Sequence, residues 1–257
     1  MSVDLSVIVP AYNEAESIPE LYQELVAVLE YIGRSFEIIF VDDASTDGTP
    51  ALIGLLTESD ARVRGLKLLR NSRKGGALEA GFQAARGHII VTMDADLQDD
   101  PSEIERLVRE VEKGAAVVNG WKQQRRDPFQ KRMLSVLMNA LTNALLGQRF
   151  RDMNSGFKAY RAGVAQHLSI PGGLYRFIPH LLAARGHTVR EIPVSHRQRR
   201  YGHTKFGLAH RCRGLIDLMT VCWLTRILPH ALVVFGSVGC LCLILGLALW
   251  PGAVFKG

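Results

Sequence analysis

The sequence HIIVTMDADLQDDP, residues 88–101, decides how this chain folds. Its first half is short, apolar and rich in β-branched residues, which is typical of a strand buried on both faces. Its second half turns acidic and brings Asp94 and Asp96 directly after the strand. Carboxylates at alternate positions beyond a strand end can bind a hard cation such as Mg²⁺ or Mn²⁺, which is then shared with substrate phosphates. The alternative is a solvated acidic turn that begins the next helix.

Strand-like and helix-like segments alternate through the first half of the chain. The short connections predict an α/β fold with a mostly parallel sheet and helices on both faces. Polar residues follow three strand ends, so we expect one edge of the sheet to collect Asn13 and Glu14, Asp42 and Asp43, and Asp94 and Asp96. We expect strands over residues 5–9, 36–41, 63–68, 88–93 and 115–120, with Pro10 ending the first, a basic loop at 71–76 before a helix at 77–85, and a last strand near 188–193.

The composition is that of a folded protein with an anionic partner. Hydrophobic residues make up 47% of the 257 residues and charged residues 22%, which excludes a globally disordered chain. The formal net charge of +6 favours phosphate groups, a membrane surface or nucleic acid as the partner. We do not expect nucleic acid, because base-stacking aromatic residues are not interleaved with the basic clusters.

Residues 231–250 form an uninterrupted run without a charge. Such a run is long enough to cross a hydrocarbon core of about 30 Å. Basic residues are abundant before it and only Lys256 follows, so the positive-inside rule places everything before Ala231 in the cytoplasm. Residues 208–228 mix apolar and charged side chains. They form either an amphipathic helix in the membrane interface, with Trp223 as an anchor, or a helix packed on the folded domain.

Five motifs, in this order, resemble family 2 glycosyltransferases with the GT-A fold: VIVPAYNEAESI, IIFVDDASTDGT, KGGALEAGFQAARGHIIVTMDADLQDDP, RDMNSGFKAYR and HRQRRYGHTKFG. The last two, with a membrane helix after them, are similar to the branch that glycosylates polyprenyl phosphates. The resemblance covers about residues 4–250, with Thr204 at a position where serine is common. It implies a GT-A domain over 1–207, a juxtamembrane amphipathic helix over 208–228, a transmembrane helix over 229–250 and a short tail over 251–257.

This resemblance implies inverting transfer of a sugar from a nucleotide-diphosphate sugar, UDP-glucose as the first candidate, to undecaprenyl phosphate. The metal, Mg²⁺ or Mn²⁺, would bind Asp94, Asp96 and Gln98, and Asp96 would be catalytic. Asp152 would orient the acceptor as a second catalytic residue, or it would pair structurally with Arg151 or Arg161. The residues expected to bind the nucleotide sugar are Pro10, Tyr12, Asn13, Glu14, Asp42, Lys74, Asp94 and Asp96, and those expected at the donor or acceptor phosphates are Lys122, Arg132, Ser155, Arg197, Arg199 and Lys205.

The chemistry of this reaction agrees with such residues. A divalent ion and basic side chains stabilise the leaving nucleoside diphosphate. The attacking phosphate has its second pKa near 6, so no strong general base is needed. The alternatives are a family 2 transferase acting on a polysaccharide or a lipid headgroup, and a basic membrane-binding protein without turnover. The resemblance places the enzyme in the cytoplasmic membrane, with its catalytic domain in the cytoplasm, and makes a homo-oligomer plausible.

Overall fold

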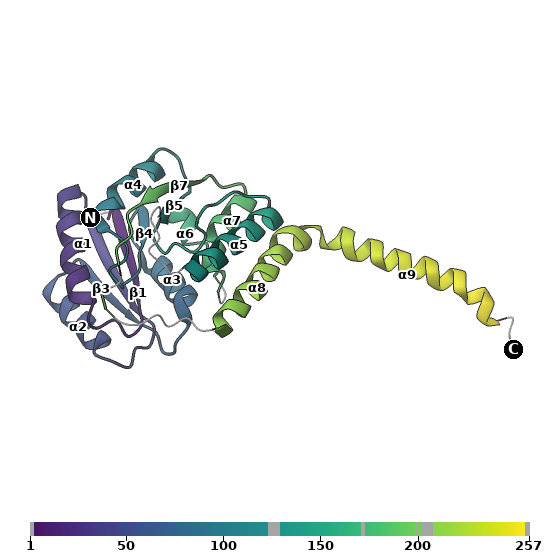
Figure 1. Ribbon diagram of the computed structural model, residues 1–257, viewed down its shortest axis with the longest axis horizontal. Coiled ribbons are helices and arrows are strands. Elements are labelled where there is room, and N and C mark those ends of the chain that lie inside the picture. Colours follow the sequence, from purple (N-terminus) through teal and green to yellow (C-terminus); the bar gives the residue numbers. More distant parts are fainter. Residues whose placement is uncertain (1–2, 123–128, 171–172, 199, 202–207, 255–257) are drawn as a thin grey trace.

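A computed structural model describes residues 3–122, 129–170, 173–198, 200–201 and 208–254. Within these residues a seven-stranded sheet lies between two layers of helices, and one long helix extends away from the domain (Figure 1). The predicted α/β architecture with a mostly parallel sheet is therefore confirmed.

The strand order is β3-β2-β1-β4-β6-β5-β7. All neighbouring strands pair in parallel except β6, which lies antiparallel between β4 and β5. The carboxyl ends of the parallel strands therefore meet at one edge of the sheet. The strands are β1 (Leu5–Ala11), β2 (Phe36–Asp42), β3 (Val63–Lys67), β4 (Ile89–Thr92), β5 (Val117–Lys122), β6 (Lys158–Arg161) and β7 (Val189–Val194).

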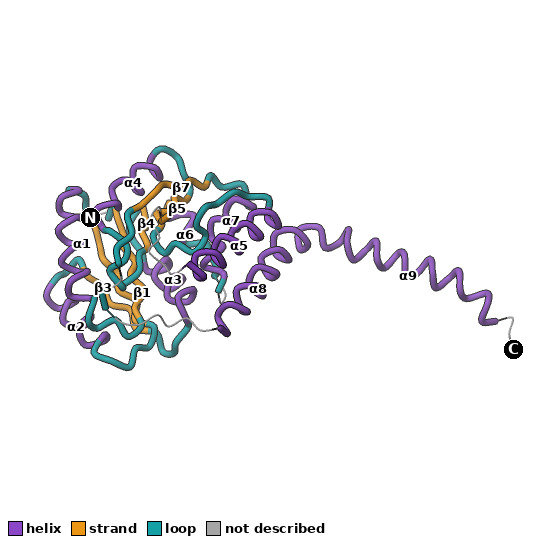
Figure 2. The backbone as a smooth tube through the Cα atoms, viewed as in Figure 1, coloured by secondary structure: helices purple, strands orange, loops and turns teal. Residues whose placement is uncertain are grey.

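Each face of the sheet has its own apolar core, and the helices lie on either side of the strands (Figure 2). One core buries the apolar faces of α1, α2 and α4. The other takes residues from α3, α6, α7 and α8. The helices are α1 (Ile18–Ile32), α2 (Thr49–Ser59), α3 (Arg73–Ala84), α4 (Ile104–Glu112), α5 (Phe129–Leu146), α6 (Ala162–Ala165), α7 (Ile178–Ala184), α8 (Leu208–Cys222) and α9 (Ala231–Val254), with 3₁₀ turns at Pro101–Glu103, Leu174–Phe177 and Leu228–His230 and a π turn at Trp223–Ile227.

Two predicted boundaries are wrong. Pro10 lies inside β1, where it still pairs with Val41 of β2. The pairing of β1 with β4 ends at Ile8, so no strand on that side needs the missing N–H of Pro10. The helix α3 begins at Arg73 rather than Ala77, so Lys74 lies in its first turn. The antiparallel strand β6 was not predicted.

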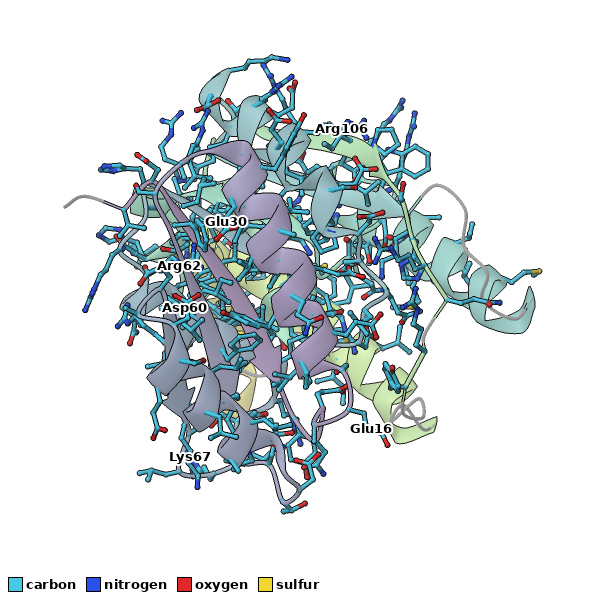
Figure 3. All side chains as sticks on the ribbon, turned by 90° about the vertical axis from the view of Figure 1, so that its left-hand side faces the viewer. Glu16, Glu30, Asp60, Arg62, Lys67 and Arg106 are labelled. Atoms are coloured by element: carbon cyan, nitrogen blue, oxygen red, sulfur yellow. The ribbon has the colours of Figure 1, made fainter. Side chains whose placement is uncertain are left out.

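At the opposite, amino-terminal edge of the sheet, Arg62 joins three elements (Figure 3). Its guanidinium lies 2.8 Å from Glu30 of α1 and 2.9 Å from Asp60, and it covers the ring of Phe36 at 4.7 Å. The Arg62 side chain is partly exposed, so this cluster contributes little stability and mainly fixes the edge.

The C-terminal part of the chain presents a large apolar surface. Gly214–Ala248 is the one segment of the described residues that is helical, long and apolar enough to cross a membrane, and no part of its apolar window is buried. Figure 1 shows α9 leaving the domain at the end of α8. Before α9, exposed apolar side chains also lie on α5, α8 and the π turn that follows α8: Met133, Val136, Leu137, Leu141, Leu145, Leu215, Ile216, Met219, Trp223 and Leu224.

Gly81 sets the distance between α3 and the sheet. A Cβ atom at this position would lie 2.5 Å from Cγ2 of Ile8, which is buried in β1. We expect Gly81→Ala to destabilise the fold by about 1–3 kcal/mol through overpacking. Gly54→Ala in α2, where no atom lies within 4 Å, is the control and should stabilise by about 0.5–1 kcal/mol. Thermal unfolding followed by tryptophan fluorescence would measure both, and equal melting temperatures would contradict the close contact.

Candidate active site

The loops after β1 and β2 are joined to each other by hydrogen bonds. The backbone N–H of Asn13 donates to Oγ of Ser45 at 2.9 Å, and Oδ1 of Asn13 accepts from the N–H of Thr46 at 2.8 Å. Glu14 donates its N–H to Oγ1 of Thr49. Asn13 has a positive φ of 54°, a conformation that asparagine tolerates better than most residues. The predicted nucleotide-binding segment that contains Pro10, Tyr12, Asn13 and Glu14 is thus held against the β2–α2 loop.

Asp42 and Asp43, at the end of β2, are both buried but differ in their bonding. Oδ1 of Asp42 accepts from the N–H of Ser45, whereas its Oδ2 has no hydrogen-bond partner among the described residues. Oδ1 of Asp43 accepts from the N–H of Ser72 at 2.6 Å, and burial raises the pKa of this carboxyl. Asp43 therefore fixes the loop before α3, and Asp42 keeps one buried oxygen without a hydrogen-bond partner among the described residues.

Lys74 and Asp94 form an ion pair at the end of β4. The two side chains are 23% and 30% exposed, and the ammonium lies 5.4 Å from the centre of the Tyr175 ring. Although burial acts against both charges, Asp94 raises the pKa of Lys74 to about 12, and Lys74 with Lys122 lowers the pKa of Asp94. Gly156 packs directly against the pair. A Cβ at this position would lie 2.5 Å from Oδ1 of Asp94 and 2.6 Å from Nζ of Lys74.

The predicted metal residues follow one another around a tight turn. Oδ1 of Asp96, which is buried, accepts from the N–H of Gln98 at 3.2 Å, with Leu97 at a positive φ between them. The Gln98 carbonyl accepts from the N–H of Arg197 at 2.8 Å, which joins this turn to the segment after β7.

The side chains of this turn have the donor atoms that a divalent ion prefers. The described residues contain no cluster of three or more His, Cys, Asp and Glu side chains that could hold a metal alone. Mg²⁺ usually binds one or two protein carboxylates and takes its other ligands from water and substrate phosphates. Asp94, Asp96 and the Gln98 amide are hard oxygen donors of this kind, so their chemistry suits the metal site, which stays a prediction.

Asp99 was not predicted as a site residue, yet it is buried behind Asp94. Its Oδ2 accepts from the N–H of Asp94 at 3.3 Å, and its Oδ1 lies 3.7 Å from Nζ of Lys122. Burial raises the pKa of the Asp99 carboxyl, while Lys122 opposes that change. Lys122, at the end of β5, thus lies within the same group of charges as Lys74 and Asp94.

The loop before β6 places Asp152 and Ser155 beside this group. The Asp152 carboxylate is buried and accepts from the N–H groups of Asn154 at 3.2 Å and Lys122 at 3.5 Å. The Ser155 hydroxyl is buried and bonds the backbone of Phe157. The Arg151 guanidinium lies 5.0 Å from the centre of the Trp121 ring. Both predicted acceptor residues are therefore tied into the loop that carries Gly156.

Lys158 lies among the same charges, and the sequence did not predict it. It is 2% exposed, pairs with both Thr92 and Asn119 across the sheet, and donates to the carbonyl of Ser155. Burial, with the nearby charge of Lys74, lowers the pKa of Lys158 to about 7. Its signal in the sequence was a single lysine between Phe157 and Ala159, in a segment too short to be predicted as a strand.

The remaining predicted phosphate contacts are either paired with carboxylates of the protein or lie outside the described residues. The Arg197 guanidinium lies 2.7 Å from Glu24 and 3.0 Å from Asp100, so two carboxylates of the protein already bind it. The side chain of Arg132, and residues Arg199 and Lys205, lie outside the part of the chain that the structure describes.

The model of the family described as glycosyl transferase family 2 matches residues 6–169, which include the carboxyl ends of β1, β2, β4 and β5 and the whole of β6. The chain belongs to this family. It is 35% identical over 235 residues to undecaprenyl-phosphate 4-deoxy-4-formamido-L-arabinose transferase of Edwardsiella ictaluri, covering 91% of this chain and 72% of that protein. It is 32% identical to dodecaprenyl-phosphate galacturonate synthase of Rhizobium johnstonii, covering 93% and 72%. The protein is therefore a nucleotide-sugar-dependent glycosyltransferase.

Solved structures show the same GT-A fold. Glucosyl-3-phosphoglycerate synthase from Mycobacterium tuberculosis, in complex with Mn²⁺, UDP and phosphoglyceric acid, matches with a TM-score of 0.65 at 21% identity, covering 86% of this chain and 78% of that one. Mannosyl-3-phosphoglycerate synthase from Rubrobacter xylanophilus matches with a TM-score of 0.69 at 16% identity, covering 86% and 74%. The predicted fold class is confirmed by these matches.

A methyl group at Gly156 would displace the Lys74–Asp94 pair from beneath. We expect Gly156→Ala to weaken the binding of a nucleoside diphosphate with Mn²⁺ by about tenfold, since a charge-assisted contact is worth about 1.5–3 kcal/mol. Gly163→Ala, in α6, has no atom within 4 Å and serves as the control. Isothermal titration calorimetry would measure both affinities, and unchanged binding by the Gly156 variant would refute the role of the pair.

Proposed function

We propose that this enzyme transfers a sugar from a UDP-sugar to a polyprenyl phosphate at the cytoplasmic face of a membrane, with inversion at the sugar carbon. The proposal rests on the presence of two features in the same chain. Carboxylates and lysines meet at the ends of β4 and β5, and an apolar helix of membrane-spanning length follows the domain. Both curated relatives described above act on polyprenyl phosphates, which supports the acceptor.

The donor would lie across the ends of β1, β2 and β4. The Asp42 carboxyl, whose Oδ2 is buried without a hydrogen-bond partner among the described residues, would accept a hydrogen bond from the base or the ribose. Lys74 and Lys122 would bind the diphosphate oxygens and stabilise the negative charge that develops on the leaving group. Asp94, Asp96 and Gln98 would hold Mg²⁺ or Mn²⁺, which supplies Lewis-acid stabilisation of the same diphosphate.

The acceptor needs positioning more than activation. A phosphate monoester is largely dianionic at neutral pH, so its oxygen can attack the sugar carbon without losing a proton to a strong base. The Asp152 carboxylate is buried and accepts two backbone N–H groups, which suits a residue that shapes the acceptor loop. We therefore propose that Asp152 positions the loop that receives the acceptor. The binding energy of the lipid phosphate would orient its attacking oxygen toward the sugar carbon.

The names of the relatives bear on which sugar the donor carries. UDP-glucose was the donor expected from the sequence, but the relatives carry 4-deoxy-4-formamido-L-arabinose and galacturonate in their names. The donor class that we propose is therefore a UDP-sugar drawn from these three types. A polysaccharide or headgroup acceptor is the competing reaction, and the lipid requirement of the enzyme separates the two.

The decisive experiment measures UDP release by the full-length protein in detergent. Each of the three UDP-sugars would be supplied with and without undecaprenyl phosphate, in Mg²⁺, in Mn²⁺ and in EDTA. We expect release from one donor that needs both the lipid and the metal. The variant Asp96→Asn should lower kcat/KM by about 100-fold or more, because it removes one ligand charge from the predicted metal site.

Asp4→Asn is the matched control, since Asp4 precedes β1 at the opposite edge of the sheet and bonds Ser35. Its activity should stay within about twofold of the parent. Lipid-independent release, or release from no donor by folded protein, would reject the polyprenyl-phosphate acceptor and favour the competing reaction.

A further inference from the structure

A pocket of about 480 Å³ lies apart from the strand-end site, where α5, α7 and the turns before α9 meet. Figure 1 shows these elements together at the base of α9. The volume is within the range of about 300–1,000 Å³ that is usual for small-ligand sites. Its lining is rich in polar groups, and no candidate catalytic residue contributes to it: Leu146, Gly147, Gln148, His180, Ala183, Ala184, Thr225, Arg226 and His230.

Arg226 gives this pocket a positive charge. Among the described residues, no carboxylate forms an ion pair with its guanidinium. The guanidinium packs closely on the backbone after α5, because a Cβ at Gly147 would lie 2.6 Å from its Nη2 atom. Gly147 also has a φ of +69°, so glycine is favoured there for both reasons. The chain thus brings an arginine without an acidic partner to the wall of a pocket.

Two further features of the wall point to a ligand. Arg226 belongs to the π turn Trp223–Ile227, and such turns occur frequently at functional sites. His180 is buried, and its Nε2 lies 3.3 Å from Oδ1 of Asn143. That oxygen also accepts from the N–H of Phe150, so Nε2 carries the proton and Nδ1 is an acceptor. Burial lowers the pKa of His180 to about 4, which keeps the ring neutral, and Nδ1 has no partner among the described residues.

The position of the pocket favours a membrane lipid as the source of the ligand. It adjoins the first turn of α9 and the exposed apolar faces of α5 and α8, so its opening would lie at headgroup depth if α9 crosses the bilayer. The cytoplasmic leaflet is rich in anionic lipids, and each basic residue near it gains about 1 kcal/mol. The ring of Trp223 packs on Phe235 at 6.0 Å and fixes the start of α9 beside the pocket.

We propose that this pocket binds the headgroup of an anionic glycerophospholipid, with the phosphodiester on Arg226 and a headgroup hydroxyl directed toward His180. Phosphatidylglycerol has this chemistry. Such a site would hold a structural lipid at the junction of the catalytic domain and α9, separate from the acceptor phosphate.

The test is lipid binding by the full-length protein in an uncharged detergent, counted by native mass spectrometry. Short-chain phosphatidylglycerol, short-chain phosphatidylcholine and inorganic phosphate would be titrated separately. We expect one phosphatidylglycerol to bind in preference to phosphatidylcholine, and Arg226→Gln to weaken it by about tenfold. Arg149→Gln is the matched control, since Arg149 is an exposed arginine beside Gln148 that does not line the pocket. It should leave the affinity within about twofold, and Arg226→Lys should retain part of it.

Four binding outcomes would overturn the proposal. Equal losses in the two glutamine variants would mean diffuse surface charge, and equal binding of the two lipids would mean that the headgroup charge is not recognised. Arg226-dependent binding of inorganic phosphate without lipid binding would assign the pocket to a free anion. Displacement of phosphatidylglycerol by one equivalent of undecaprenyl phosphate would assign it to the acceptor. Unchanged melting temperatures would show that the variants are folded.

Discussion

The site depends on one antiparallel strand inside an otherwise parallel sheet. Because β6 runs against β4 and β5, the loop before it reaches the same edge as the ends of these two strands. That loop brings Gly156 beneath Lys74 and Asp94, and it brings Asp152 to the backbone of Lys122. A parallel strand in this position would have sent the loop to the other edge. The loop before β6 and the charged side chains at the ends of β4 and β5 meet because of this reversal.

The site keeps its charges nearly balanced before any ligand arrives. Lys74, Lys122 and Lys158 lie near Asp94, Asp99 and Asp152, and burial opposes the charges of Lys74, Lys158, Asp94 and Asp99. Buried charges persist only when they are paired or hydrogen-bonded. The depressed pKa of Lys158 and the raised pKa of Asp99 show where pairing is least complete. A diphosphate bound with a divalent ion adds little net charge, so the balance survives donor binding.

The sequence was sufficient for the features that depend on local pattern. Apolar runs in the sequence predict the buried strands. Asp94 and Asp96 could be predicted as site residues because they follow directly after such a run. It was insufficient for Lys158 and Asp99, whose importance comes from neighbours distant in the chain. The strand β6 is four residues long and carries a lysine, so its pattern was too short to separate from a loop. Arg197 could be recognised as basic, but only the fold reveals that Glu24 and Asp100 bind it.

The exposed apolar faces of α5 and α8 have a consequence for how the enzyme finds its acceptor. These faces would hold the catalytic domain against the bilayer even without α9, as a monotopic protein. A lipid acceptor and an enzyme confined to one surface then meet by diffusion in two dimensions. The encounter rate would follow the surface density of the lipid rather than its bulk concentration, and the water-soluble donor alone would arrive from three dimensions.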